Sequence, residues 1–302
     1  MRYPSGRLVS VVLLAVLVVC GLGALLGRSA CTGGSHPQSA RPDLQRVLDG
    51  MVSSWSKITP GVTAYVAGPH GVWTGSAGIA APGVPMAPDA RLRLNSVGKT
   101  WTATLILKLV GEHKMGLDDS VARWLPGLLP YGEQISVRQL LRMTSGMIDT
   151  NDLYARPHHY FAKLKDPALR ARAIALFRHP AASPDDPNPT QTWIQIAATL
   201  GLLYKPDTTW HYSNIGYMVV GLIAARAGGA DLATLFRRQI IDPLHLASAR
   251  YDPAPDITGP HAHGYIINSD GTLTDATGWT QGLAAEGGIV SDAADEAHFL
   301  QA

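Results

Sequence analysis

The hydropathy pattern changes from two short alternating stretches to a long helical part, and that change is the strongest constraint on the fold. Apolar residues at helical spacing predict a helix over Asp43–Trp55. Alternating residues then predict two strands, over Val62–Val66 and Gly71–Ala77, joined by a Gly/Pro turn. From Val97 onwards the pattern is mostly helical. Because two strands do not form a stable sheet by themselves, they need partners from elsewhere in the chain.

The helical part is long and is interrupted by Pro-rich loops. It is followed by a small predicted hairpin over Tyr265–Asn268 and Thr272–Thr274, and a last helix begins near Asp292. Apolar spacing predicts helices over Val97–Glu112, Val137–Met143, Leu169–Phe177, Thr192–Leu202, Ile215–Ala227 and Leu232–Ile240. The sequence therefore predicts a small sheet element and a large helical body.

The N-terminal segment has the pattern of a targeting sequence. Arg2 and Arg7 precede an apolar run over Leu8–Leu26, and small residues follow it. We interpret residues 1–31 as a signal peptide or, since the run is near the length that spans a bilayer, as a membrane anchor through residues 8–26. Lipid attachment at Cys31 is a third alternative. Residues 32–42 are a Gly/Ser/Pro linker, so we expect residues 43–302 to work outside the cytoplasm, secreted or anchored to the cell membrane.

Cysteine content and charge exclude several classes of function. Cys20 and Cys31 are the only cysteines, so residues 43–302 contain no disulfide, thiolate metal site or cysteine nucleophile. The formal net charge is +2 without a dense Lys/Arg run, so no nucleic-acid partner is expected. His158-His159 and His261-x-His263 lack acidic or thiol neighbours at metal spacing. We therefore expect no metal and no other cofactor.

Ser96 and Lys99 form the strongest chemical signal. They are three residues apart at the predicted start of a helix, so their side chains share one helix face. A neutral amine one turn away can take the proton of a serine hydroxyl, and burial favours the neutral amine. The alternative is an N-cap serine followed by a surface lysine.

Tyr212-Ser213-Asn214 is a second signal, at the predicted junction between a loop and the helix over Ile215–Ala227. A phenol and a carboxamide two residues apart can reach into one cleft, where the phenol relays a proton and the amide holds a carbonyl and an ammonium. The alternative is a core tyrosine with an N-cap asparagine.

Several short motifs occur in an order that resembles the serine β-lactamase and penicillin-binding-protein superfamily. Within it, the chain resembles the class-C-like branch, most of all secreted D-alanyl-D-alanine carboxypeptidases. The resemblance covers roughly residues 43–302. The motifs are Ser96-Val97-Gly98-Lys99, Gly116-Leu117-Asp118-Asp119-Ser120-Val121, Trp124-Leu125-Pro126, Thr144-Ser145-Gly146, Trp210-His211-Tyr212-Ser213-Asn214 and Gly287-Gly288-Ile289-Val290-Ser291.

This resemblance implies a fold and a mechanism. The fold is α+β: an α/β lobe with an antiparallel sheet flanked by helices, and an all-helical lobe over roughly residues 96–285. Ser96 would attack a D-alanyl-D-alanine peptide or a β-lactam and form an acyl-enzyme, while Lys99 takes its proton. Tyr212 would pass a proton to the leaving amine, and Asn214 would bind the substrate amide. The resemblance also places Trp279 at the cleft, with a packing tryptophan as the alternative.

The chain also departs from this family. A third motif, Lys/His-Thr/Ser-Gly on a late strand, supplies an oxyanion donor in the family. Ala276-Thr277-Gly278 lacks its basic residue, and the chain ends within the predicted last helix. We therefore expect a member that is truncated at its C-terminus, without the final sheet strands. Because loss of one oxyanion donor removes about 2.7–4 kcal/mol of transition-state stabilisation, we expect this chain by itself to be inactive or poorly folded.

Three readings of the function follow. The first is a secreted or membrane-tethered serine hydrolase of cell-wall D-alanyl-D-alanine peptides, which also binds penicillin. The second is a β-lactamase or a small-ester esterase with the same residues. The third is a non-catalytic remnant that lacks the third motif.

Overall fold

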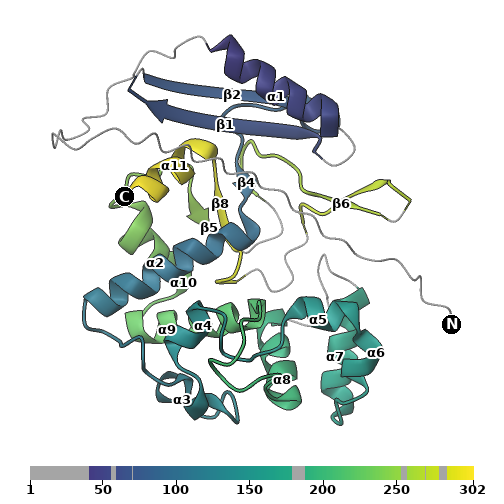
Figure 1. Ribbon diagram of the computed structural model, residues 1–302, viewed down its shortest axis with the longest axis vertical. Helices are drawn as coiled ribbons and strands as arrows, with labels where there is room; N and C mark the ends of the chain where they lie inside the picture. Colours follow the sequence, from purple (N-terminus) through teal and green to yellow (C-terminus); the bar gives the residue numbers. More distant parts are fainter. Residues whose placement is uncertain are drawn as a thin grey trace.

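A computed structural model describes residues 41–55, 59–69, 71–178, 188–252, 257–268, 270–278 and 284–302. The predicted targeting segment over residues 1–31 lies outside the described residues, as does nearly all of the linker over residues 32–42. Figure 1 shows a layer of helices and strands above a body of helices. This is the mixed α+β architecture that the sequence predicts.

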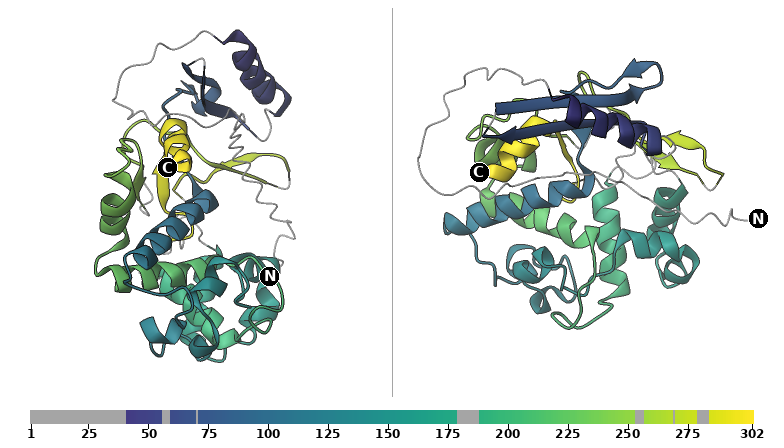
Figure 2. Two further views of the ribbon diagram at one scale, coloured as in Figure 1. Left: turned by 60° about the vertical axis from the view of Figure 1, so that its left-hand side comes forward. Right: turned by 45° about the horizontal axis from the view of Figure 1, so that its top comes forward.

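The upper layer is a helix on an antiparallel ribbon. Helix α1 (Pro42–Trp55) is followed by β1 (Gly61–Gly68), β2 (Gly71–Ala81) and the short β3 (Val84–Pro85), paired in the order β1-β2-β3. The β1–β2 register runs from Gly61 opposite Gly78 to Gly68 opposite Gly71, so both strands are longer than predicted. Helix α1 contacts β1 and β2, and α11 (Ala293–Gln301) contacts β1 from the other side (Figures 1 and 2).

A second small sheet, which the sequence pattern did not predict, lies between the two lobes. Its strands β4 (Leu92–Arg93), β8 (Ile289–Ser291) and β5 (Arg250–Tyr251) pair antiparallel in the order β4-β8-β5. Strands of two or three residues are too short to show the alternation by which a strand is recognised in sequence. Strand β8 is fully buried, and the Leu94 N–H donates to the Ile289 carbonyl at 2.9 Å. This pairing fixes the chain immediately before Ser96.

The helical lobe is built around α9 (Asn214–Gly228), which buries residues on all sides from Ile215 to Ala224. Its longer neighbours match the predicted helices, while three short helices between residues 121 and 161 were not predicted. The other helical segments are η1 (Asn95–Val97), α2 (Gly98–Gly111), α3 (Val121–Trp124), η2 (Gly132–Gln134), α4 (Val137–Leu141), α5 (Thr150–Ala155), α6 (Pro157–Phe161), α7 (Pro167–Arg178), α8 (Pro189–Leu200), α10 (Leu232–Phe236) and the π-helical turn η3 (Arg237–Ile241).

The predicted limits of the helical lobe, residues 96–285, extend too far along the chain. Its last helical turn ends at Ile241, and β5 begins nine residues later at Arg250. The hairpin of β6 (Tyr265–Ile267) and β7 (Leu273–Asp275) follows, as the sequence predicts. The hydropathy pattern did not indicate where the helical lobe ends, because the residues between η3 and the hairpin form short strands and loops without periodicity.

Helix α2 joins the two lobes. Trp101, Leu105, Ile106 and Leu109 have no exposed surface and lie within the main hydrophobic core. On the side of the upper layer, Trp101 stacks on Phe299 of α11 with ring centroids 4.2 Å apart. Figure 2 shows α2 between the β-rich layer and the helical body. Because α2 is held from both sides, its N-terminal turn is a rigid place for reactive side chains.

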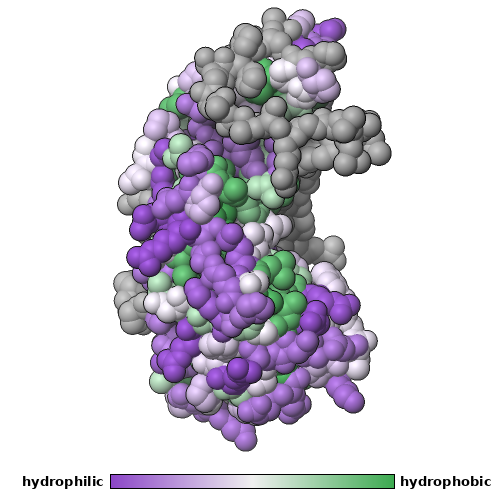
Figure 3. All heavy atoms as spheres, turned by 90° about the vertical axis from the view of Figure 1, so that its left-hand side faces the viewer, coloured by the Kyte–Doolittle hydropathy of each residue, from purple (hydrophilic) through white to green (hydrophobic). Residues whose placement is uncertain are grey.

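The face shown in Figure 3 is mainly hydrophilic, with hydrophobic residues in separate patches. Within the described part of the chain, no single helix is long and apolar enough to cross a membrane. Helix α9 and residues 232–241 together pass the same test of length and composition, but across a bend of 73°.

Candidate active site

Ser96 lies at a sharp turn between a strand and a helix. Strand β4 ends at Arg93, Asn95 has a positive φ of 46°, and the 3₁₀ turn η1 leads directly into α2. The turn exposes Ser96, while Lys99, one turn further on, is only 6% exposed. The sequence predicted that Ser96 and Lys99 share one helix face, and the two side chains are within hydrogen-bonding distance of each other. The alternative of a surface lysine is wrong for Lys99.

Lys99 is surrounded by acceptors. Its Nζ donates to the Ser96 Oγ at 3.2 Å, to the Asn214 Oδ1 at 2.7 Å and to the Glu286 carbonyl at 2.9 Å. The Nζ also lies 5.0 Å from the centre of the Tyr212 ring. Burial lowers the pKa of Lys99, although the negative charges of Glu286 and Asp149 oppose this shift. A lysine with a lowered pKa reaches its neutral, proton-accepting form nearer to neutral pH.

Tyr212 completes the group around Ser96. Its hydroxyl lies 2.6 Å from the Ser96 Oγ, although the two residues are 116 positions apart in the chain. Burial raises the pKa of Tyr212, and the hydrogen bond with Ser96 partly offsets the rise. Ser96 therefore contacts both a lysine amine and a tyrosine hydroxyl, each within reach of its proton.

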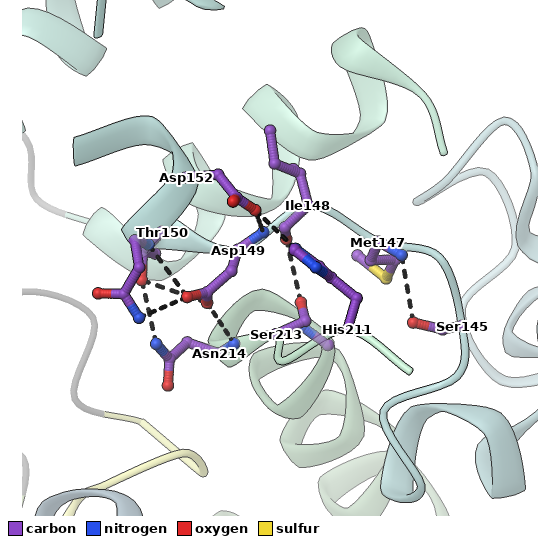
Figure 4. A network of polar contacts seen from close by, with 11 residues as sticks. Ser145, Met147, Ile148, Asp149, Thr150, Asp152, His211, Ser213 and Asn214 are labelled. Atoms are coloured by element: carbon purple, nitrogen blue, oxygen red, sulfur yellow. Dashed lines mark hydrogen bonds and ion pairs between the residues drawn. The ribbon is translucent and has the colours of Figure 1, made fainter. Parts of the chain in front are cut away.

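A buried carboxylate, which the sequence analysis missed, holds Asn214 in place (Figure 4). The Asp149 Oδ1 accepts the backbone N–H of Asn214 at 2.6 Å, and Asp149 is 3% exposed. The Asn214 Nδ2 donates to the Thr150 Oγ1 at 3.1 Å, which leaves the Oδ1 aimed at Lys99. Burial raises the pKa of Asp149, and hydrogen bonds from Asn214 and Asn151 oppose the rise. The signal in the sequence was the position of Asp149, three residues after Thr144-Ser145-Gly146.

The Thr144-Ser145-Gly146 motif positions the segment that carries Tyr212. Asp207 N–H donates to the Thr144 carbonyl at 2.8 Å, and Thr144 Oγ1 donates to the Asp207 carboxylate at 2.7 Å. Gly146 has a φ of 79°, and a Cβ there would lie 2.1 Å from the Tyr204 carbonyl oxygen. Only glycine fits this close approach. The motif is therefore structural support for the site and does not touch Ser96.

The stretch Asn151–Tyr154 belongs to helix α5. Within it, Leu153 is fully buried and Tyr154 packs against Trp193. The Asp152 carboxylate accepts a hydrogen bond from the His211 Nε2 at 2.7 Å (Figure 4). The capping box of Asp149 and Asp152 explains why a helix begins here.

The remaining predicted site residue, Trp279, lies outside the described residues. Among the residues that the structure describes, no group of three or more His, Cys, Asp or Glu side chains is placed to hold a metal ion. His263 does have an acidic neighbour that the sequence analysis missed, because the Asp275 carboxylate lies 2.6 Å from its Nδ1 across the β6–β7 hairpin base.

Comparison with known proteins identifies the family of this chain. The profile of the family described as Beta-lactamase matches residues 45–302. The chain belongs to the β-lactamase family. It resembles a penicillin-binding protein of Bacillus subtilis, with 27% identity over 189 residues that cover 61% of this chain and 36% of the relative. The esterase EstB of Burkholderia gladioli is 29% identical over 172 residues, which cover 54% of this chain and 38% of that protein.

A solved structure shows the same fold. The D-stereospecific amidohydrolase of a Streptomyces species superimposes with a TM-score of 0.69 and 26% identity, covering 87% of this chain and 72% of that one. The chain spans between about a third and a half of the length of the first curated relatives that it matches. These likenesses support the superfamily and the fold that the sequence motifs predicted.

Proposed function

We propose that the protein is a serine hydrolase that forms an acyl-enzyme through Ser96. The main observation in support of this proposal is that the Ser96 Oγ lies 3.2 Å from the Lys99 Nζ and 2.6 Å from the Tyr212 hydroxyl. Neutral Lys99 takes the hydroxyl proton as the Ser96 oxygen bonds to the substrate carbonyl carbon. Tyr212 delivers a proton to the leaving amine, so that the carbon–nitrogen bond breaks and the acyl group stays on Ser96.

In the proposed mechanism, Asn214 binds both Lys99 and the substrate. Its Oδ1 accepts from the Lys99 Nζ, and one Nδ2 hydrogen is donated to Thr150. In this proposal the second Nδ2 hydrogen binds the substrate amide. The backbone N–H of Ser96, at the start of the helix, serves as an oxyanion donor. Water then attacks the acyl-enzyme on the reverse path, with Tyr212 and Lys99 returning the protons.

The substrate class that we propose is a D-alanyl-D-alanine peptide of the cell wall, cleaved as by a carboxypeptidase. Similarity to a penicillin-binding protein and to a D-stereospecific amidohydrolase supports an amide next to a D-residue. We further propose that residues 1–31 export the protein, on the basis of Arg2, Arg7 and the apolar run. Fusion of residues 1–42 to a reporter that is active only outside the cytoplasm tests the export.

The test of the acyl-enzyme is labelling with a fluorescent penicillin, followed by intact-mass and peptide mapping. We expect one label per chain, on Ser96, and none on S96A. The matched control is S53A, which removes an exposed serine from α1 and keeps full labelling. A chain that is folded by circular dichroism, remains unlabelled and turns over neither a peptide, an ester nor penicillin contradicts the proposal and favours the non-catalytic alternative.

A small-ester esterase is the second candidate, and similarity to EstB favours it. Three substrates separate the candidates: a D-alanyl-D-alanine peptide, a nitrophenyl ester of a short acid, and penicillin. Turnover of the peptide with slow release of penicillin supports the peptidase, and fast release supports a β-lactamase. Turnover of the ester alone contradicts the peptide assignment.

A further inference from the structure

A buried acid lies beside Lys99 but takes no part in the mechanism above. The loop over residues 284–288 packs directly against the first turns of α2. The Glu286 carbonyl accepts from the Lys99 Nζ at 2.9 Å, and the Ala285 carbonyl accepts from the Thr102 Oγ1 at 2.5 Å. A Cβ on Gly98 would lie 3.5 Å from the Gly287 Cα, which shows how close the two segments approach. Glu286 is therefore fixed next to the base of the site.

The carboxyl group of Glu286 is only partly satisfied. The residue is 5% exposed, and its Oε1 accepts the Ala284 N–H at 3.0 Å. Its Oε2 is buried and has no hydrogen-bond partner among the described residues. A buried carboxylate with one bare oxygen is costly unless it is protonated or balanced by a nearby cation. Lys99, whose Nζ donates to the backbone carbonyl of the same residue at 2.9 Å, is the adjacent cation.

We propose that Glu286 is a positioning residue that sets the pH at which Lys99 becomes neutral, and hence the pH at which Ser96 reacts. This inference rests on the proposed function of Ser96 and Lys99. Glu286 acts through Lys99: its carbonyl orients the Nζ, and its carboxylate, once ionised, stabilises the ammonium form. It does not touch the Ser96 hydroxyl in this structure.

The direction of the effect follows from the charges. Burial raises the pKa of Glu286 and lowers that of Lys99, so the two groups titrate in a common range and each ionised form stabilises the other. An ionised Glu286 therefore delays the loss of the Lys99 proton as the pH rises. Without that negative charge, Lys99 becomes neutral at a lower pH.

Other groups around Lys99 do not cancel this effect. Asp149 faces it from the segment before α5 and also favours the ammonium, but its carboxylate already accepts hydrogen bonds from Asn214 and Asn151. Tyr212 and Tyr217 present ring faces 5.0 Å and 5.7 Å from the Nζ. These groups remain in place when Glu286 is replaced, so a change in the Lys99 titration reports on Glu286.

The experiment follows the Lys99 titration directly, by NMR of protein labelled with ¹³Cε-lysine, with K99R to assign the signal. In E286Q we expect the midpoint for Lys99 to fall by about one pH unit. The rate of Ser96 labelling by penicillin rises with pH as Lys99 loses its proton, and in E286Q we expect this rise to lie about one pH unit lower. At a given pH within the rise, labelling is then up to about tenfold faster than in wild type. A merely structural role of Glu286 moves neither midpoint.

The matched control is E296Q. Glu296 is also a buried acid with one unpartnered oxygen, but its carboxylate accepts from Trp101 Nε1 at 3.1 Å and it does not act on Lys99. E296Q leaves the Lys99 midpoint unchanged. An unchanged midpoint in E286Q, or an equal shift in both variants, overturns the proposal.

A measurement on the unmodified protein covers the case in which E286Q and a second variant, E286M, fail to fold. The Lys99 signal in the wild-type chain then shows two titration steps, one from each member of the pair. A single step overturns the proposal. If the Lys99 midpoint shifts in E286Q but Ser96 is never acylated, the control of the Lys99 protonation by Glu286 stands and the proposed function of Ser96 fails.

Discussion

At the residue scale, reactivity depends on how differently two neighbouring side chains are exposed. Ser96 faces solvent, while Lys99 lies beneath it with three oxygen acceptors and two tyrosine rings around its amine. The acceptors satisfy the ammonium form, and burial opposes it. The balance between the two decides when Lys99 can accept a proton from Ser96.

Replacement of Tyr212 by phenylalanine tests the second contact of Ser96. Y212F removes the hydroxyl that lies 2.6 Å from the Ser96 Oγ and keeps the buried ring. We expect the rate constant for penicillin labelling to fall at least about hundredfold, because a positioned acid or base contributes that much. Y204F, on an exposed ring, is the control. A labelling rate within threefold of wild type in Y212F, taken as roughly the experimental scatter, removes Tyr212 from the mechanism.

At the element scale, the site depends on contacts between helices that are distant in sequence. Asp149 caps α5 and also holds the first residue of α9 through the Asn214 N–H. Ser213 caps α9 and donates to the Ile148 carbonyl at 3.0 Å. The two helix starts are thus joined to each other, and the side chain of Asn214 is aimed from that junction.

D149N tests this junction. The substitution removes a buried charge-assisted acceptor, so we expect the free energy of unfolding to fall by about 1–3 kcal/mol. Labelling of Ser96 slows as well, because Asn214 loses its fixed orientation. D152N is the comparison, since Asp152 pairs with His211 and does not contact Asn214. Urea unfolding gives the change in stability, and penicillin labelling gives the change in reactivity. If D149N and D152N lower the unfolding free energy and the labelling rate equally, Asp149 has no specific role.

The contact between α2 and α11 predicts a pH dependence of stability. Burial raises the pKa of Glu296 to about 7, against an ordinary value near 4.5, although Trp101 donates to it. The folded state thus holds the proton more tightly than the unfolded state. This contribution is complete below about pH 4.5 and is lost as the pH rises to about 7, an effect of about 3 kcal/mol.

E296Q removes this contribution to the pH dependence. We expect the free energy of unfolding of wild type to fall more steeply between pH 4.5 and pH 7 than that of E296Q. E133Q, which replaces an exposed glutamate, keeps the wild-type slope. Parallel curves for wild type and E296Q show that Glu296 is ionised in both states.

At the scale of the whole molecule, burial is divided unevenly between the two lobes. Helix α9 buries nearly every residue of its first ten, whereas β1 has no buried residue. The upper layer contacts the rest of the molecule through α11, which packs on β1, and through the His263 N–H, which donates to the Ala80 carbonyl at 2.8 Å. The helical lobe therefore carries most of the core, and the β1–β2 ribbon is less firmly packed.

Hydrogen exchange tests this division. We expect the amides of α9 to exchange at least about tenfold more slowly than the paired amides of β1 and β2, because local opening of the ribbon exposes little apolar surface. Mass-spectrometric exchange of peptides from both regions gives the comparison. Equal protection shows that the two lobes unfold as one cooperative unit.

Local rules explain what the sequence predicted well. Ser96 and Lys99 share a helix face because the spacing of three is short-range geometry. Tyr212 and Asn214 stand at a helix start because the apolar periodicity of the following residues begins there. Family motifs added the expectation that the two pairs meet, and the distances show that they do.

Only the tertiary structure revealed the groups that tune the site. The local pattern at Asp149 marks only a helix cap, and Glu286 carries no local pattern. Their roles at the site come from contacts with residues 65 and 187 positions away. Strands β4, β5 and β8 were not predicted either, because strands of two or three residues are recognised only by the strands with which they pair. The sequence determined which reactive groups each element presents. Long-range packing decided their environment, because desolvation and charge coupling depend on what surrounds a group in space.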